Sequence, residues 1–264
     1  MTTEDQRPDP TAETARFFRI LADQTRLTIV QFLALSDRRA GEIVEAIHLP
    51  QNAVSYHLKQ LRTVGLLRDR RSSADGRDVY YTIDQERLGA LYRQAGAILQ
   101  PLTPARTTTT SNDRDPDHRL RLLFLCTHNS ARSQFAEGIA RRVGGADMVA
   151  YSAGDTPTGL HPITSALLAE WGIDPADQWS KPLDTFAGQS FDYVITVCDR
   201  VREHCPTFPG DPPQLHWSLP DPTAAPEAER WDAFRAVRHE VDVRVRHLLR
   251  AQMQQVDSDP SVAA

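Results

Sequence analysis

Cys126 and Arg132 enclose the segment CTHNSAR, whose residue types and length suit a loop that wraps an anion. The apolar run RLLFLC before it predicts a strand, and SQFAEGIARRVGG after it predicts a helix that begins near Ser133. The free N–H groups and the dipole at a helix N-terminus favour negative charge. Successive N–H groups of such a loop can converge on a tetrahedral oxyanion, and the Arg132 guanidinium can close the ring. The spacing by itself also fits a buried cysteine that ends a strand.

Cys126 is expected to react as a nucleophile, because the field at a helix N-terminus favours a thiolate. Ser133 lies where its hydroxyl can donate a hydrogen bond to the Cys126 sulfur. We therefore expect Cys126 and Arg132 to be catalytic. The residues expected to hold the anion are Thr127, His128, Asn129, Ser130, Ala131 and Ser133.

Two more cysteines follow in VITVCDRVREHCP, where Cys198 ends an apolar run and Cys205 lies seven residues later. The chain has three cysteines, and an odd number in a chain without a secretory signal argues against a structural disulfide framework. A zinc site would need a fourth ligand and closer cysteine spacing, so we expect no metal there. Thiol chemistry is the favoured interpretation.

The segment FLCTHNSARSQFAEG resembles the anion loop of the low-molecular-weight phosphatase fold, which small tyrosine phosphatases share with thioredoxin-coupled arsenate reductases. In LHWSLPDPTAAP, Asp221 resembles the general acid of that fold, although taken alone it is a turn carboxylate. Small tyrosine phosphatases tend to have tyrosines after this Asp-Pro and a proline after the Arg-Ser of the loop. The residues found at these positions, which favour the reductase, are Thr223, Ala224 and Gln134.

The resemblance implies a mechanism in which Cys126 attacks arsenate and Asp221 protonates the departing oxygen. Cys198 then attacks the Cys126 sulfur and releases arsenite, and Cys205 attacks Cys198. Thioredoxin or a similar reductant would reduce the final disulfide. The resemblance requires no cofactor and implies an optional potassium ion near Asn129, Glu137 and Ser152. Many relatives have glycine at the position of His128.

The pattern of the first hundred residues predicts a DNA-binding domain. Helices are expected within 12–34, with a break at Asp23 and Thr25, and at 40–47, 52–64 and 84–99. LLRDRR and RDVYYTI flank SSADG and predict a hairpin, which completes a winged helix-turn-helix pattern. A basic patch alone would also fit a solvated surface. The residues expected to contact DNA from the reading helix are Gln51, Asn52, Ser55, Tyr56, His57, Lys59 and Arg62, and those from the hairpin are Arg70 and Arg71.

The segments ARFFRILADQTRLTIVQFL, NAVSYHLKQLRTVGLL and YYTI resemble the ArsR-type metalloregulatory repressors. The resemblance implies a homodimer through the N-terminal domain that binds operator DNA and releases it on sensing an inducer. The segment GEIVEAIHL lacks the cysteine pair of arsenite and cadmium sensors, and the helix DQERLGALYRQAGAIL lacks the ligands of zinc sensors. We therefore expect that this domain does not sense metal by itself.

Strands and helices alternate after residue 118, which predicts a parallel sheet covered on both faces. The expected fold is thus two domains: an N-terminal, mainly α winged helix-turn-helix domain and a C-terminal α/β domain with a central parallel sheet of the low-molecular-weight phosphatase type. The expected boundaries are 1–101 for the DNA-binding domain, 102–118 for a linker, 119–254 for the reductase-like domain and 255–264 for a disordered tail. The chain has neither an apolar stretch of about 18 residues nor a signal-like N-terminus, so we expect a cytoplasmic protein without membrane contact.

The leading hypothesis is an arsenic-responsive repressor fused to an arsenate reductase. One alternative is a regulator whose phosphatase-like domain only senses oxyanion or arsenite. The other is a low-molecular-weight protein tyrosine phosphatase with a targeting domain.

Overall fold

The computed structural model describes residues 9–74, 76–99 and 119–256. The chain divides into two compact units, one built mainly from residues before 100 and the other mainly from residues after 118. The linker expected at 102–118 and most of the expected tail lie outside the described residues. Among the helices of the described ranges, none combines the length and the apolar character needed to cross a membrane.

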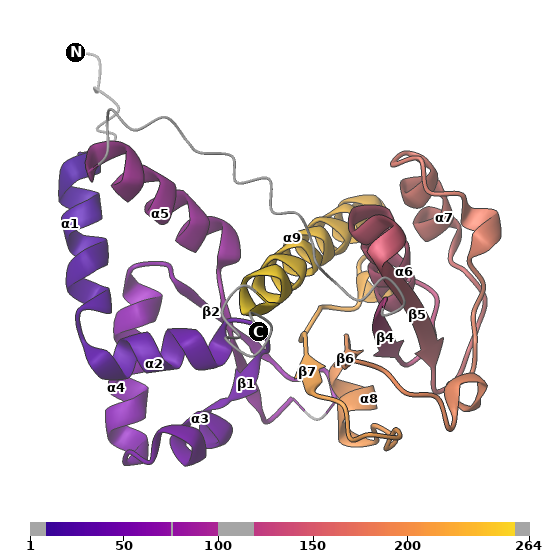
Figure 1. The fold of residues 1–264 in the computed structure, drawn as a ribbon, viewed down its shortest axis with the longest axis horizontal. Coiled ribbons are helices and arrows are strands. Elements are labelled where there is room, and N and C mark those ends of the chain that lie inside the picture. The colour runs from indigo at the N-terminus through magenta and orange to yellow at the C-terminus, as the bar shows by residue number, and fades with distance from the viewer. Residues whose placement is uncertain (1–8, 75, 100–118, 257–264) are drawn as a thin grey trace, which may run out of the picture. The chain divides into compact units, whose positions relative to one another are not determined.

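The N-terminal unit consists of five helices and a small sheet within the described residues (Figure 1). The elements in chain order are α1 (Pro10–Leu21), α2 (Gln24–Leu33), β1 (Arg38–Arg39), α3 (Ala40–Ile47), α4 (Gln51–Thr63), β2 (Leu67–Arg71), β3 (Val79–Ile83) and α5 (Gln85–Leu99). In the sheet, β3 lies between β1 and β2, and β1 pairs with it antiparallel. The sequence predicted all of these elements except β1, which has only two residues.

Local features set where α2 begins and how α3 turns into α4. Asp23 caps α2 by accepting a hydrogen bond from the Arg26 amide at 3.0 Å, so the break expected at Asp23 and Thr25 is made by Asp23. His48 ends α3 in the left-handed region with φ 57°, and Pro50 caps α4. The chain therefore turns tightly between the two helices, as a helix-turn-helix requires.

The core of the N-terminal unit is apolar and takes up one face of each helix. Its members with exposure of 2% or less include Phe17, Ile29, Leu33, Ile43, Val54, Leu58 and Leu61. Because the apolar face of α4 is buried against this core, the polar face of α4 is directed outward.

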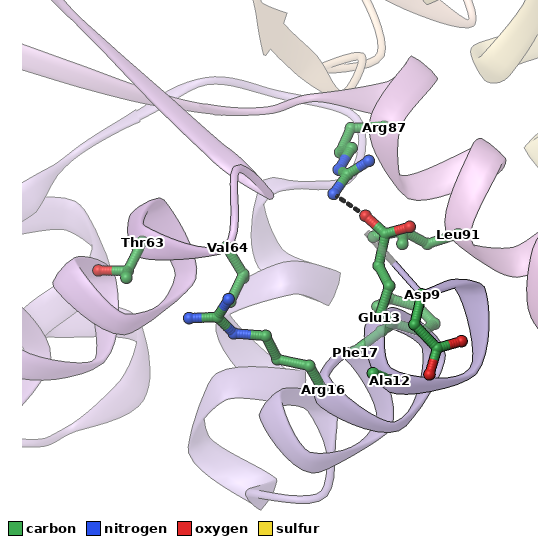
Figure 2. A pocket seen from close by; sticks show the side chains of 9 residues that line it. All are labelled: Asp9, Ala12, Glu13, Arg16, Phe17, Thr63, Val64, Arg87 and Leu91. Atoms are coloured by element: carbon green, nitrogen blue, oxygen red, sulfur yellow. Dashed lines mark hydrogen bonds and ion pairs between the residues drawn. The ribbon is translucent and has the colours of Figure 1, made fainter. Parts of the chain in front are cut away.

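A pocket of about 360 Å³ opens between α1, the end of α4 and α5 (Figure 2). Figure 2 shows Glu13 of α1 beside Arg87 of α5, and Arg87 Nη2 lies 2.5 Å from Glu13 Oε1. The hydrogen bond from Arg87 holds the pKa of Glu13 below its usual value. This ion pair joins the first and the last helix of the unit.

The C-terminal unit has a four-stranded sheet in the order β5-β4-β6-β7, and every pair of neighbours is parallel. Its principal elements are β4 (Leu120–Cys126), α6 (Arg132–Gly144), β5 (Met148–Gly154), α7 (Pro162–Ala169), β6 (Tyr193–Thr196), α8 (Asp199–Glu203), β7 (Gln214–His216) and α9 (Arg230–Val256). The sequence did not predict β7, whose three residues are too few to show a period. The helix α6 begins at Arg132, one residue earlier than expected.

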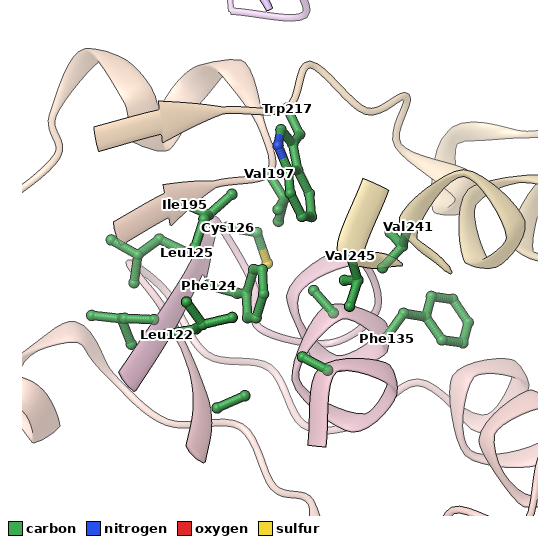
Figure 3. Packing of buried hydrophobic residues seen from close by; sticks show 14 of the residues in the cluster. Leu122, Phe124, Leu125, Cys126, Phe135, Ile195, Val197, Trp217, Val241 and Val245 are labelled. Atoms are coloured by element: carbon green, nitrogen blue, oxygen red, sulfur yellow. The ribbon is translucent and has the colours of Figure 1, made fainter. Parts of the chain in front are cut away.

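The sheet is buried on both faces (Figure 3). Leu122, Leu123, Phe124 and Leu125 of β4 are all 0% exposed, although successive side chains of a strand point to opposite faces. Phe124 lies against Trp217, with ring centroids 5.7 Å apart. A strand without polar alternation is typical of a parallel sheet covered by helices. The predicted fold class is confirmed in both units.

The topology places the candidate chemistry at one edge of this sheet. Cys126 is the last residue of β4, and Cys198 follows the end of β6 by two residues. The segment after β7 carries Asp221. The carboxyl ends of parallel strands meet at the same edge, which is where open α/β sheets bind their ligands.

Candidate functional site

Cys126 lies at the floor of the loop 126–132, and its side chain is only 2% exposed. The Asn129 amide donates a hydrogen bond to Sγ at 3.2 Å, and Ser133 Oγ lies 2.9 Å from Sγ. The Asn129 amide reaches the sulfur from the loop and Ser133 reaches it from the first turn of α6, where the helix dipole favours negative charge. The arrangement stabilises a thiolate, and it gives Ser133 the contact that the sequence predicted for it.

The backbone of the loop is held from outside by the segment that follows β5. The carbonyls of Thr127, His128 and Ser130 accept hydrogen bonds from the amides of residues 156, 158 and 161, at 2.8, 3.1 and 3.1 Å. A Cβ atom on Gly154 would come within 2.8 Å of the Asn129 nitrogen, so only glycine allows the strand to lie this close. Because these carbonyls are turned outward, loop N–H groups can turn inward, as the Asn129 amide does toward the sulfur.

Asn129 organises the loop through its side chain. It is 0% exposed and has φ 45°, in the left-handed region that asparagine tolerates better than most residues. Its Nδ2 donates to Ser133 Oγ at 2.8 Å and to Ser152 Oγ at 2.7 Å. Its Oδ1 accepts from Gln134 Nε2 at 3.0 Å and from the Lys181 amide at 2.7 Å. All four hydrogen-bonding positions of the amide are used.

This network fixes the direction of the hydrogen bond on the sulfur. Ser133 Oγ accepts from Asn129, so its own proton is available for Cys126 Sγ. In the same way Ser152 Oγ accepts from Asn129 and donates to the Glu137 carboxylate. A continuous chain of hydrogen bonds therefore runs from the buried carboxylate of Glu137 to the sulfur of Cys126.

Arg132 and Asp221 form an ion pair at the mouth of the loop. Arg132 is 5% exposed, its Nη2 lies 2.7 Å from Asp221 Oδ2, and its Nη1 donates to the Leu219 carbonyl at 3.2 Å. The amide and the hydroxyl of Thr223 donate to Asp221 Oδ1 at 3.0 and 2.7 Å. Burial raises the pKa of Asp221, but the Arg132 charge and the Thr223 hydrogen bonds outweigh it, so the pKa lies below its usual value.

The second thiol lies beside the loop. Cys198 caps α8 and is 1% exposed, and its Sγ lies 3.4 Å from the hydroxyl oxygen of Thr127, the residue next to Cys126. Burial raises the pKa of Cys198, and the charge of Cys126 raises it further, against the opposing effects of Arg132 and Thr127. The second thiol, Cys198, is therefore held in its protonated form.

The third thiol, Cys205, follows α8 and is half-buried. Burial raises its pKa to about 11. All three cysteines are free thiols. The resemblance to arsenate reductases predicted that the three cysteines act in one site, and Cys198 contacts the loop through Thr127.

The three residues expected near a potassium ion, Asn129, Glu137 and Ser152, lie together beneath the loop and are all 0% exposed. Lys181 Nζ lies 3.1 Å from Glu137 Oε2. Sequence reasoning missed Lys181, and it used Gln134 only to discriminate between relatives. Gln134 bonds to the loop from only two residues beyond it, whereas Lys181 reaches the loop from a remote segment. No local pattern in the sequence marks Lys181 as a partner of the loop.

Two parts of the chain match known protein families. Residues 121–260, more than half of the chain, match the family described as low molecular weight phosphotyrosine protein phosphatase. The chain belongs to this phosphatase family. Residues 23–69 match the family described as bacterial regulatory protein, arsR family. The predicted fusion of an ArsR-type domain with a domain of the phosphatase family is confirmed.

Relatives of the phosphatase-family domain include proteins named arsenate reductase. That of Halalkalibacterium halodurans is 37% identical over 127 residues, which cover 47% of this chain and 91% of the relative. That of Bacillus subtilis is 38% identical over 127 residues, with the same coverage. A solved structure described as an arsenate reductase in oxidized state is 30% identical, covers 50% of this chain and 97% of its own, and has a TM-score of 0.44.

Upstream of the phosphatase-family domain, α4 carries most of the residues expected to contact DNA. The exposed members of the set on α4 are Gln51, Asn52, Ser55, Tyr56, Lys59 and Arg62. Tyr56 is 56% exposed, so its ring and hydroxyl are accessible on this face of α4. One face of the helix thus presents amide, hydroxyl and cationic groups, the types that bind base edges and phosphates.

The remaining members of the DNA set are held differently. The His57 side chain is 15% exposed, and its Nδ1 lies 3.8 Å from Asp23 Oδ1, so it faces α2 rather than the open side of α4. Arg70 is half-buried, and exposed Arg71 donates to the Gly76 carbonyl at 3.2 Å. Among the exposed residues of α4, Arg62 is ion-paired, with its Nε 2.9 Å from Asp69 Oδ1 of β2. The exposed face of α4 is therefore the stronger candidate for DNA contact.

Proposed function

We propose that this chain reduces arsenate to arsenite through Cys126, Cys198 and Cys205. The observation that carries the proposal is the second thiol, Cys198, which contacts the Cys126 loop through Thr127. Hydrolysis of a phosphate ester needs one thiol, whereas the two-electron reduction of arsenate needs a second thiol to complete a disulfide. Two relatives that match over 91% of their own length are named arsenate reductase.

In the first step the loop N–H groups and Arg132 bind arsenate, and Cys126 attacks the arsenic. Asp221 supplies a proton to the departing oxygen, which leaves as water. Arg132 and Asp221 are paired before the substrate binds. An oxyanion that engages the guanidinium weakens this pairing, and Asp221 then takes up the proton that a general acid needs.

In the second step Cys198 attacks the sulfur of Cys126. The sulfur–arsenic bond breaks, its electron pair stays on arsenic, and arsenite leaves as a Cys126–Cys198 disulfide forms. The charge of Cys126 raises the pKa of Cys198 in the resting chain. Bonding to arsenic removes that charge, so Cys198 becomes a better nucleophile only after the first step.

In the third step Cys205 attacks Cys198 and frees Cys126. The Cys198–Cys205 disulfide then accepts two electrons from thioredoxin or a similar dithiol. Cys205 has a pKa raised to about 11 by burial, so its thiolate is scarce at neutral pH. This exchange is therefore expected to be slow unless α8 moves the thiol toward solvent.

For the N-terminal unit we propose that a homodimer binds operator DNA as an arsenic-responsive repressor. The match to the arsR family and the exposed polar face of α4 support this role. DNA binding and arsenate reduction are separate activities of separate units, and either can be tested alone.

The deciding experiment measures arsenite formation from arsenate with thioredoxin, thioredoxin reductase and NADPH, in the parent chain and in Cys198→Ser. The parent is expected to turn over, and Cys198→Ser is expected to stop before arsenite is released. Hydrolysis of an aryl phosphate is the matched control, because it needs Cys126 and Arg132 but not Cys198, and Cys198→Ser should retain it.

The alternatives give different results. A phosphatase would hydrolyse aryl phosphate and make no arsenite with any dithiol reductant. If Cys198→Ser made arsenite at the parent rate, the thiol relay would be wrong. A regulator that only senses would make no arsenite, and its DNA binding would change when arsenate or arsenite is added.

A further inference from the structure

We propose that the ammonium group of Lys181 serves as a built-in monovalent cation beneath the anion loop, so that the loop keeps its form without potassium. Lys181 is thus a positioning residue, which acts on Cys126 through Glu137 and Asn129. The activity arm of the test rests on the proposed arsenate reduction. The stability arm does not.

The first argument is the burial of charge. Glu137 is 0% exposed and the Lys181 side chain is 4% exposed. A buried carboxylate is costly unless a cation and hydrogen bonds compensate it. Arg141 also pairs with Glu137, but its side chain is 37% exposed and approaches from the surface. Lys181 therefore supplies the positive charge on the inner side of Glu137.

The second argument is the way in which Lys181 is held. Its Nζ donates to Glu137 Oε2 at 3.1 Å and to the Trp179 carbonyl at 2.8 Å. The same nitrogen lies 4.4 Å from the centroid of the Trp179 ring. Two oxygens and a π face surround the ammonium group, as a desolvated cation requires. Burial lowers the pKa of Lys181, and the Glu137 charge opposes that shift.

The third argument is that the oxygens expected to bind potassium are engaged. Asn129 Oδ1 already accepts two hydrogen bonds, from Gln134 and from the Lys181 amide. Glu137 Oε2 is bonded to Ser152 and to the Lys181 ammonium. A potassium ion needs several oxygens at once in place of its water shell. Lys181 provides the charge that the ion would bring without requiring these oxygens to turn.

The fourth argument is the connection to the reactive sulfur. Lys181 reaches Asn129 twice, directly by its backbone amide and indirectly through Glu137 and Ser152. Asn129 in turn holds Ser133, whose hydroxyl lies 2.9 Å from Cys126 Sγ. Loss of the ammonium would leave Oε2 of Glu137 without its cation on the inner side. The Ser152 and Asn129 hydrogen bonds would then loosen. The anion loop would then bind its oxyanion less tightly.

The test compares the full chain in potassium chloride and in choline chloride at equal ionic strength. The parent is expected to have the same melting temperature in both salts and the same KM for arsenate. Lys181→Ala removes the ammonium and opens a space beside Glu137. In choline chloride this variant should melt lower than the parent and have a KM for arsenate raised several-fold. Potassium chloride should raise its melting temperature by at least about 2 °C and lower its KM.

Two control variants separate this role from general loss of structure. Arg141→Ala removes the outer partner of Glu137 and leaves Lys181 in place, so it should melt at the same temperature in both salts. Combining Lys181→Ala with Glu137→Gln removes the carboxylate that would attract the ion, so potassium should no longer help. Rescue of the double variant by potassium would contradict the proposal.

Two outcomes overturn the proposal. The first is a parent chain that potassium stabilises relative to choline, and this arm needs no variant to fold. The second is a Lys181→Ala chain that folds but behaves alike in both salts. If Lys181→Ala does not fold, Lys181→Asp, which adds an oxygen ligand, replaces it with the same expectation. If the parent makes no arsenite, the proposed function fails, and the melting data still decide this inference.

Discussion

Asn129 of the anion loop and Asn52 of α4 belong to the two sets of candidate contact residues, yet Asn129 is fully buried and Asn52 is exposed. The Asn129 carboxamide exchanges hydrogen bonds with four side-chain or backbone groups of the same chain. The Asn52 carboxamide oxygen accepts from the amide of its own neighbour, Ala53, at 2.9 Å. The loop is therefore organised by contacts within the chain, whereas the polar side chains on the outer face of α4 are exposed.

This difference agrees with the function proposed for each region. A loop that stabilises charge in a reaction must have its donors aimed before the substrate arrives. A helix that binds DNA needs only a rigid backbone, because the contacts form with phosphates and base edges at the interface. Changes in the loop should thus alter chemistry and stability together, and changes on the outer face of α4 should alter binding alone.

The largest expected effect comes from Cys126→Ser. This change should lower both arsenite formation and aryl phosphate hydrolysis by on the order of 10⁴-fold or more, because a serine hydroxyl is a far weaker nucleophile than a thiolate. Measured DNA affinity should not change. A Cys126→Ser chain with weakened DNA binding would show that the two regions are not independent, and would break the comparison.

The next effect concerns the two asparagines. Asn129→Ala removes a hub of four buried hydrogen bonds and puts alanine at φ 45°, so we expect a loss of about 3 kcal/mol in the free energy of unfolding. Asn52→Ala, the matched change on α4, should shift it by no more than about 0.5 kcal/mol. Urea denaturation of both variants measures the two values. Equal losses would contradict the distinction between an internally organised loop and an outward-facing helix.

Two arginine–aspartate pairs offer a smaller and sharper contrast. Arg132 Nη2 and Asp221 Oδ2 are 2.7 Å apart with side chains 6% and 30% exposed, whereas Arg62 Nε and Asp69 Oδ1 are 2.9 Å apart with side chains 51% and 32% exposed. Asp221→Asn should cost about 1 to 2 kcal/mol of stability, because Arg132 is left buried without its partner. Asp69→Asn should cost less than about 0.5 kcal/mol, as solvent screens the exposed pair.

The pH dependence of the Asp221 pair has a definite sign. The folded chain holds the pKa of Asp221 below its usual value. The stability that it contributes is therefore present above the unfolded pKa of about 3.9 and is lost as pH falls through the lower folded value. The difference in unfolding free energy between the parent and Asp221→Asn should shrink from about pH 5 to pH 3. A difference that grows toward acid would mean that Arg132 does not govern this carboxyl.

The sequence predicted the part of the site that is local. The strand, the loop and the helix from residue 120 to residue 144 follow one another, so their order and the place of Cys126 and Arg132 could be read from composition and period. The apolar face of α4 was equally local. Gln134 is also local but was considered only for its type. Lys181 could not be predicted as a partner of Asn129, because it lies more than fifty residues away. Long-range hydrogen bonds depend on how the strands pair, and no periodic pattern in a single sequence indicates that pairing.

The smallest expected effect is that of Lys59→Ala on α4. Removal of one phosphate contact should weaken binding to duplex DNA about equally across sequences and lower the slope of log affinity against log salt by about 1. Fluorescence anisotropy at several salt concentrations measures both. The matched control is Arg235→Ala, which removes a charge from α9. The Arg235 side chain is 51% exposed. If Arg235→Ala lowers the slope as much as Lys59→Ala does, DNA responds to the charge of the whole surface. A slope that changes only with Lys59→Ala assigns the contact to the outer face of α4, because only a cation that displaces counterions from a phosphate contributes to it.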